Sequence, residues 1–230
     1  MSETSASLDY TEYGTRPFLA ILFSLFLAGF AVFSSLYCVQ PMMPFLAKFF
    51  QVTPTHSSFP LSFSTIALAL GLLFAGLISD RFGRKKIMVI SLFSTSILLL
   101  ISSFLPYWEI FLATRMMVGL AVSGVASVAM TYIGEEIAAK DVGFAMGLYI
   151  SGTAIGGMGG RLISGVLLDY ISWQTATMII GTLNLAIAII FYLALPASKH
   201  FNAYPINLNR FIESFKKNLA DVKLRLLFAE

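Results

Sequence analysis

The sequence predicts an all-α polytopic membrane protein, and three observations support this fold class. Of the 230 residues, 57% are hydrophobic and 12% are charged, whereas a soluble domain has about 25% charged residues. The hydrophobic residues form six runs long enough to cross about 30 Å of hydrocarbon as helices. The runs show no alternation along the chain, which excludes a porin-like barrel. The net charge of +3 does not indicate a nucleic-acid partner, because the charges lie between the apolar runs.

Each predicted span is bounded by proline, glycine or charged residues. Arg16 precedes the first span; Asp80 follows the second and Pro106 the third. In lipid, every backbone N–H and C=O group must be satisfied within its segment, and a helix meets that condition. The six predicted transmembrane helices cover residues 17–39, 59–78, 87–105, 109–133, 144–168 and 174–195.

The distribution of lysine and arginine predicts the orientation of the spans. With the N-terminus inside, Lys48 is the one basic residue that falls in an external loop. Because basic residues collect in cytoplasmic loops, both termini of this chain are predicted to be cytoplasmic. Residues 1–16 then form a cytoplasmic N-terminal tail, 17–195 the six-helix transmembrane bundle and 196–230 a cytoplasmic linker.

The linker carries an amphipathic helical pattern. Apolar residues recur at helical spacing from Phe211 to Leu226, and Lys216, Lys217 and Lys223 lie largely elsewhere around that helix. Two interpretations remain open: a helix that lies on the inner leaflet, or a solvated linker helix.

The sequence shows no signature of an enzyme or of a bound cofactor. Cys38 is the single cysteine, which excludes an intramolecular disulfide and a cysteine-based metal site. His56 and His200 have no nearby set of ligands, and no phosphate-binding loop or catalytic triad is present. We therefore expect no catalytic residue, no metal and no cofactor.

The most informative segment lies between the second and third predicted spans and reads GLISDRFGRKK from Gly76 to Lys86. Asp80 ends a helix, where the helix dipole opposes a carboxylate, so it should have a cation or another helix N-terminus as its partner. Gly83 suits a turn with positive φ. Gly76 would let a neighbouring helix come close.

This segment resembles the loop signature of the major facilitator superfamily, Gly-x-x-x-Asp-Arg-x-Gly-Arg-Arg/Lys-Arg/Lys. The resemblance implies a fold of 12 helices in two six-helix halves, of which this chain would be the N-terminal half. It also implies that the loop latches the two halves in one access state. Every defining position matches: Gly76, Asp80, Arg81, Gly83, Arg84, Lys85 and Lys86.

Three further segments are similar to motifs of this superfamily. Arg115 and Gly119 match its Arg-x-x-Gln-Gly element, with Val118 where glutamine is usual. Residues 40–44 are similar to the Pro-x-x-Pro ending of drug-efflux members, and residues 147–161 look like their antiporter motif, without its proline. The chain is similar to bacterial inner-membrane members of efflux type over residues 13–18, 36–41, 146–169 and 226–230.

Two arginines lie inside predicted spans and are the candidates for intramembrane function. A charge at membrane depth costs about 2.5–3.5 kcal/mol by insertion scales, so Arg115 and Arg161 should face the bundle interior. The functional interpretation is an anion site or a proton-coupling element. The structural interpretation is a cation bonded to backbone carbonyls, to Glu109 or to Asp169.

No acidic residue lies in the middle of a predicted span. The nearest ones are Asp80, Glu109, Glu135 and Asp169, all at span ends. A proton-carrying carboxylate would be one of these or would lie in the second half. One of Glu135 and Glu136 is expected to pair with Arg81 or Arg84.

Glycines and a few polar residues complete the candidates. Gly152, Gly156 and Gly160 form one helix stripe that favours close packing, as do Gly119 and Gly157; bending at Gly156-Gly157 is the alternative. Asn184 is expected to form a hydrogen bond between helices. The residues that could line a cavity, or belong instead to the interfacial aromatic belt, are Tyr37, Gln40, Tyr132 and Tyr149.

These observations predict part of a secondary active transporter in the bacterial inner membrane. By resemblance it would move a small organic solute by alternating access, as a proton-coupled antiporter in efflux. Its partners would be the solute, protons, the lipid bilayer and a second six-helix half, on the same or another chain, and not nucleic acid. The alternative is an incomplete half-transporter without transport activity that acts as a membrane-embedded partner or is a relic.

Overall fold

The chain forms a bundle of long helices, as the sequence predicts. The computed structural model describes residues 10–198 and 201. Among these described residues, six helices are long and apolar enough to cross a membrane by length and composition, which confirms the predicted fold class. The elements are α1 (Arg16–Tyr37), α2 (Met43–Phe50), the 3₁₀ turn η1 (His56–Ser58), α3 (Phe59–Phe82), α4 (Arg84–Ser102), α5 (Trp108–Glu136), α6 (Val142–Leu168) and α7 (Trp173–Ala194).

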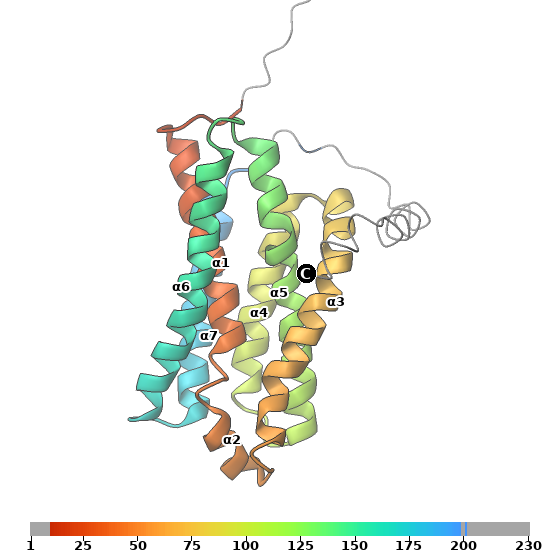
Figure 1. Ribbon diagram of the computed structural model, residues 1–230, viewed down its shortest axis with the longest axis vertical. Coiled ribbons are helices and arrows are strands. Elements are labelled where there is room, and N and C mark those ends of the chain that lie inside the picture. Colours follow the sequence, from red (N-terminus) through yellow and green to blue (C-terminus); the bar gives the residue numbers. More distant parts are fainter. Residues whose placement is uncertain (1–9, 199–200, 202–230) are drawn as a thin grey trace, which may run out of the picture.

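The bundle is built from two closely packed helix pairs, α1 with α6 and α3 with α5. Helix α4 packs against α5 and α7, and α7 packs against α1, so α4 and α7 together link the two pairs; in Figure 1, α4 lies between them. We call the end where α1 begins the N end and the opposite end the α2 end; α2 lies at the bottom of Figure 1. The junction of α3 and α4 and the loop between α5 and α6 both lie at the N end.

Several helices extend beyond the predicted spans. Helix α3 continues past residue 78 to Phe82, and α4 starts at Arg84 rather than at 87. Gly83 alone separates the two helices, with φ of 96°, as its position predicts. Hydropathy locates the hydrocarbon boundary, whereas a helix continues through polar residues as long as its backbone hydrogen bonds are made.

The chain after α1 forms a short helix that the hydropathy pattern does not predict, because eight residues cannot span a membrane. Phe50 at the end of α2 packs against Trp108, Phe111 and Trp173, and the ring centroids within this group lie 5.2 to 6.0 Å apart. These aromatic contacts fasten α2 to α5 and α7 at the α2 end.

The glycine stripe of α6 is the surface on which α1 packs. A Cβ added at any of three glycines would lie 2.8 to 3.1 Å from a backbone carbonyl carbon of α1 and closer still to its oxygen. This geometry supports the packing interpretation of the stripe. The facing pairs are Gly152 with Phe26, Gly156 with Phe30 and Gly160 with Ser34.

Asn184 joins α7 to α1, which confirms the expected hydrogen bond between helices. Its Nδ2 donates to Ser35 Oγ at 2.7 Å, and its Oδ1 accepts from Ser34 Oγ at 3.3 Å. Asn184 is 1% exposed, so this pair of bonds satisfies an amide that would otherwise be buried without partners.

The segment before α1 is tied to the loop between α5 and α6. Thr11 N donates to Glu136 O at 2.9 Å, and Ala138 N donates to Thr11 O at 3.1 Å. Tyr13 N donates to Asp141 Oδ2 at 3.1 Å. The predicted amphipathic helix at the C-terminus lies outside the described residues, except for Phe201.

Candidate functional site

At the N end, Arg84 joins the α3–α4 junction to α5. Its Nη2 lies 2.8 Å from Glu135 Oε1, and its Nε lies 3.1 Å from Glu135 Oε2. Its Nη1 donates to Asp80 and to Ser79 Oγ in the last turns of α3. The expected pairing of Asp80 with a cation, and of Glu135 or Glu136 with Arg81 or Arg84, is therefore confirmed for Asp80, Glu135 and Arg84.

Helix dipoles make this three-residue network interdependent. Asp80 and Glu135 lie in the last turns of α3 and α5, where the dipole is negative, and Arg84 begins α4, where it is positive. Each charge alone is unfavourable at its own helix end. Together they compensate one another, and the Arg84 side chain is 10% exposed, so its charge depends on these two carboxylates.

Three contacts tie the network and its surroundings to the chain after α7. Lys85 Nζ donates to Leu195 O, beyond the end of α7, and Tyr132 OH donates to Pro196 O at 3.0 Å. The Arg84 guanidinium lies 5.9 Å from the centroid of the Phe201 ring. The segment that leaves the bundle is thus held against the same α3–α4 junction.

The remaining residues of the loop motif make weaker contacts among the described residues. Arg81 and Lys86 lie over the Phe82 ring, at 5.5 and 5.9 Å from its centroid. The close helix approach expected at Gly76 is not found, because a Cβ there would meet no described atom within 4 Å. Gly76 lies on a face of α3 that the described residues leave uncovered.

Arg115 is buried and bonded to the end of α1. It is 2% exposed, and its Nη1 and Nη2 donate to Ser35 O at 3.2 Å and to Leu36 O at 2.9 Å. The last carbonyls of a helix have no partner within that helix, so Arg115 satisfies two of them. These contacts favour the structural interpretation of Arg115, with carbonyls rather than Glu109 or Asp169 as its partners.

Arg161, in contrast, lies on the surface of α6 beside two other candidate residues. Its Nε donates to Gln40 Oε1 at 2.6 Å, and its Nη1 donates to Gly157 O at 3.1 Å. The guanidinium carbon lies 4.1 Å from the centroid of the Tyr37 ring. Each of these residues is a candidate from the sequence. Their contact could not be predicted, because Arg161 lies more than 120 residues after Tyr37 and Gln40 and no sequence pattern links them.

Two tyrosines of the candidate set are buried, and one of them lines a cavity of about 330 Å³ at the N end: Tyr132 lies there beside Arg16 and Pro196. Tyr149 is 3% exposed and Tyr132 is fully buried, and both belong to the main apolar core. The cavity role of Tyr149 stays a prediction, because its ring is buried in the core of this half. Gly157, next to this stripe, differs from Gly152, Gly156 and Gly160, since a Cβ there would meet the Tyr37 and Arg161 side chains and not a helix backbone.

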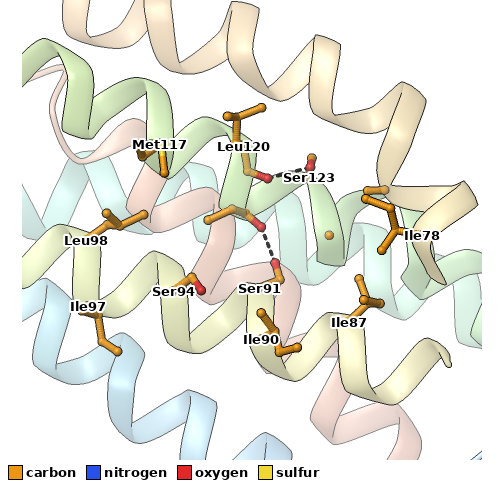
Figure 2. A pocket seen from close by; sticks show the side chains of 13 residues that line it. Ile78, Ile87, Ile90, Ser91, Ser94, Ile97, Leu98, Met117, Leu120 and Ser123 are labelled. Atoms are coloured by element: carbon orange, nitrogen blue, oxygen red, sulfur yellow. Dashed lines mark hydrogen bonds between the residues drawn. The ribbon is translucent and has the colours of Figure 1, made fainter. Parts of the chain in front are cut away.

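A groove with a volume of about 540 Å³ lies between α3, α4 and α5, and Figure 2 shows its lining. Its walls are mainly Ile, Leu and Met side chains, including Ile78, Ile97 and Met117. Ser91 and Ser123 donate their hydroxyl hydrogens to backbone carbonyls of α5, so they offer no donor to a solute. This groove suits hydrocarbon better than a polar solute. Among residues 10–198 and 201, no group of three or more His, Cys, Asp or Glu side chains could hold a metal ion.

Comparisons with known proteins identify the family. Residues 25–229 match the family model of the Major Facilitator Superfamily. The chain therefore belongs to this superfamily of membrane transporters, as the loop motif at Gly76–Lys86 predicts, and not to a family of enzymes. It is 47% identical to the inner membrane transport protein YnfM of Escherichia coli, over 96% of this chain and 53% of that protein.

Two other comparisons agree. The chain is 43% identical to the uncharacterized MFS-type transporter YybF of Bacillus subtilis, over 96% of this chain and 55% of that protein. A crystal structure of an inward-facing, unoccupied bacterial homologue of the human lysosomal transporter Spinster aligns with a TM-score of 0.70 at 18% identity, covering 90% of this chain and 50% of that one. The chain spans about half the length of the curated relatives it matches.

Proposed function

We propose that this chain forms the N-terminal six-helix half of a secondary active transporter that moves a small organic solute across the bacterial inner membrane by alternating access. Proton-coupled efflux is the mode we propose. The observation that carries this function is the Asp80–Arg84–Glu135 network, located at the loop motif of a chain that belongs to the Major Facilitator Superfamily.

The exposed faces of two helices support a second half as partner. In the most apolar 18-residue stretch of each helix, the share that is buried within this chain is 22% for the span of α3 and 28% for α6, whereas it is 61% for α1. A second six-helix half would cover these faces. It would also supply a partner for Asp80, whose side chain is 40% exposed beside Arg84.

In the proposed mechanism the network at the N end acts as a latch. The network holds the α3–α4 junction against α5 and favours one access state. When the transporter changes to its other access state, the second half moves relative to this junction, and this movement changes the surroundings of Asp80. No acidic residue lies in mid-span, so the proton carrier would be a span-end carboxylate such as Glu135 or a residue of the second half.

Transport by the complete protein tests this function. The native protein extracted from membranes is expected to have an intact mass near twice the 25.2 kDa of this chain, or to co-purify with a second six-helix chain. In proteoliposomes it should drive saturable solute flux that a protonophore abolishes. Saturable flux by this chain alone would contradict the need for a second half, and absence of flux from the complete protein would favour the alternative of a relic or a membrane-embedded partner.

Thiol labelling tests the proposed orientation. Cys38 is 1% exposed, so the unchanged protein should not react with a membrane-impermeant maleimide until it is denatured. A Thr55→Cys variant at the α2 end should be labelled in intact spheroplasts, because that end is proposed to face outward. A Lys140→Cys variant at the N end should be labelled only after permeabilisation, and the reverse pattern would overturn the orientation.

A further inference from the structure

The guanidinium of Arg161 is held in a defined position on an exposed face of the bundle. Gln40 accepts from its Nε at 2.6 Å, Gly157 O accepts from its Nη1 at 3.1 Å, and the Tyr37 ring lies beneath it at 4.1 Å. Arg161 and Gln40 are both exposed and Tyr37 is half-buried. The planar group is therefore oriented in advance, with one side open.

These contacts use only part of the hydrogen-bonding capacity of Arg161. A guanidinium has five N–H donors in a planar fork, and the contacts to Gln40 and Gly157 occupy one on Nε and one on Nη1. Ion pairs between two described residues join Arg84 to Asp80 and Glu135, and Lys140 to Glu12. Arg161 thus has no carboxylate partner within that part of the chain, and its Nη1 and Nη2 can still bind one in bidentate fashion.

Arg115, the other arginine inside a predicted span, does not have an exposed guanidinium with unused N–H donors. Arg115 is 2% exposed and donates both Nη groups to carbonyls of α1. Arg161 leaves its Nη2 unused and lies at the surface. Gly157 lies directly beside the site, since a Cβ there would be in ordinary van der Waals contact with the Tyr37 ring at 3.4 Å and with Arg161 Nη1 at 3.7 Å.

The direction of the side chain argues against a lipid headgroup as the partner. Arg161 lies seven residues before the end of α6 at Leu168, which is about 10 Å along the helix. An arginine that reaches for headgroups extends toward the nearer interface. The Arg161 Nη1 instead bonds Gly157 O, one turn back toward the middle of α6.

We propose that Arg161, oriented by Tyr37 and Gln40, binds the anionic group of the transported solute, so that the substrate is an organic anion carrying a carboxylate or a phosphate. This inference rests on the transport function proposed above. It names the chemical class of substrate and the residue that selects it. Gln40 and Tyr37 are positioning residues, because they act by orienting the guanidinium.

The test uses the complete transporter that contains this chain, reconstituted in phosphatidylcholine liposomes. The probes are anions paired with neutral analogues: nicotinate with nicotinamide, benzoate with benzamide, and phenyl phosphate with phenol. At least one anion should bind roughly 10- to 100-fold more tightly than its neutral analogue, the range expected for charged hydrogen bonds. Binding is measured by the ligand-dependent shift in thermal unfolding and by flux.

The variants separate this role from a structural one. Arg161→Gln should reduce the preference for the anion to nearly onefold, and Arg161→Lys should keep part of it, because lysine keeps the charge without the planar fork. The matched control is Lys48→Gln, an exposed cation at the same end of the bundle, which should keep the full preference. Arg161→Lys also serves as the readout if Arg161→Gln does not fold.

Each other result overturns the inference. An unchanged anion preference in Arg161→Gln would show that Arg161 does not bind the anion, and an accompanying loss of stability would assign it a structural role. If Arg161→Gln lost stability only in liposomes that contain phosphatidylglycerol, Arg161 would be assigned to binding of a lipid headgroup. Flux of neutral probes without binding of any anion would overturn the substrate class and leave the transport function in place, whereas absence of flux for every probe would count against the transport function itself.

Discussion

Gly119→Ala is expected to destabilise the folded protein by at least ~3 kcal/mol, at the upper end of the usual range for overpacking. The added Cβ would lie 2.8 Å from the carbonyl carbon of Ser64 and closer still to its oxygen. Both are backbone atoms of α3, so α3 and α5 must move apart. The Ser64 Oγ bond to Arg115 O, 2.8 Å long, would be strained or lost as well. Unfolding by denaturing detergent in mixed micelles, followed by circular dichroism, measures the change.

Gly134→Ala in the same helix is the matched control. A Cβ at residue 134 would meet nothing within 4 Å, so the change should be neutral or should stabilise α5 by up to about 1 kcal/mol through helix propensity. Equal stability of the two variants would show that α3 and α5 do not pack as closely as the structure describes.

Arg84→Gln is expected to destabilise the latched arrangement by about 2 kcal/mol. Removal of one partner from a buried ion pair costs about 3–5 kcal/mol, and a smaller value applies because Asp80 and Glu135 are 40% and 28% exposed. The two carboxylates would then face the negative ends of α3 and α5 without a cation. A bias of this size shifts a two-state access equilibrium roughly thirtyfold, so the initial rate of flux by the complete transporter should fall severalfold or more.

A surface pair at the same end provides the control for Arg84. Lys140 lies 3.3 Å from Glu12, and both side chains are about two-thirds exposed, at 65% and 64%. Lys140→Gln should change stability by less than about 1 kcal/mol and leave flux unchanged. The effects of Arg84→Gln and Glu135→Gln should also be less than additive, because both remove the same contact. Unchanged flux in Arg84→Gln would show that the network does not act as a latch and is an ordinary surface contact.

The candidate site was predictable only in part. The Gly76–Lys86 motif is contiguous, so the residues of the latch could be named from the sequence, and the negative end of α5 indicated that Glu135 or Glu136 needs a cation. The choice of Arg84 over Arg81 depends on the direction in which α4 leaves Gly83. The surroundings of Gly76, Tyr149 and Arg115 could not be predicted from the sequence, because they depend on which other helices cover these positions.

The sequence by itself determined the helical class, the six spans, the loop motif and the glycine stripe of α6. These features arise from the hydropathy and spacing of neighbouring residues, which act within a single helix. Only the tertiary structure decided that Arg115 bonds the carbonyls of α1 while Arg161 meets Tyr37 and Gln40. Helix periodicity places a side chain on a face but does not specify which other helix covers that face, and this depends on the packing of α1 against α6.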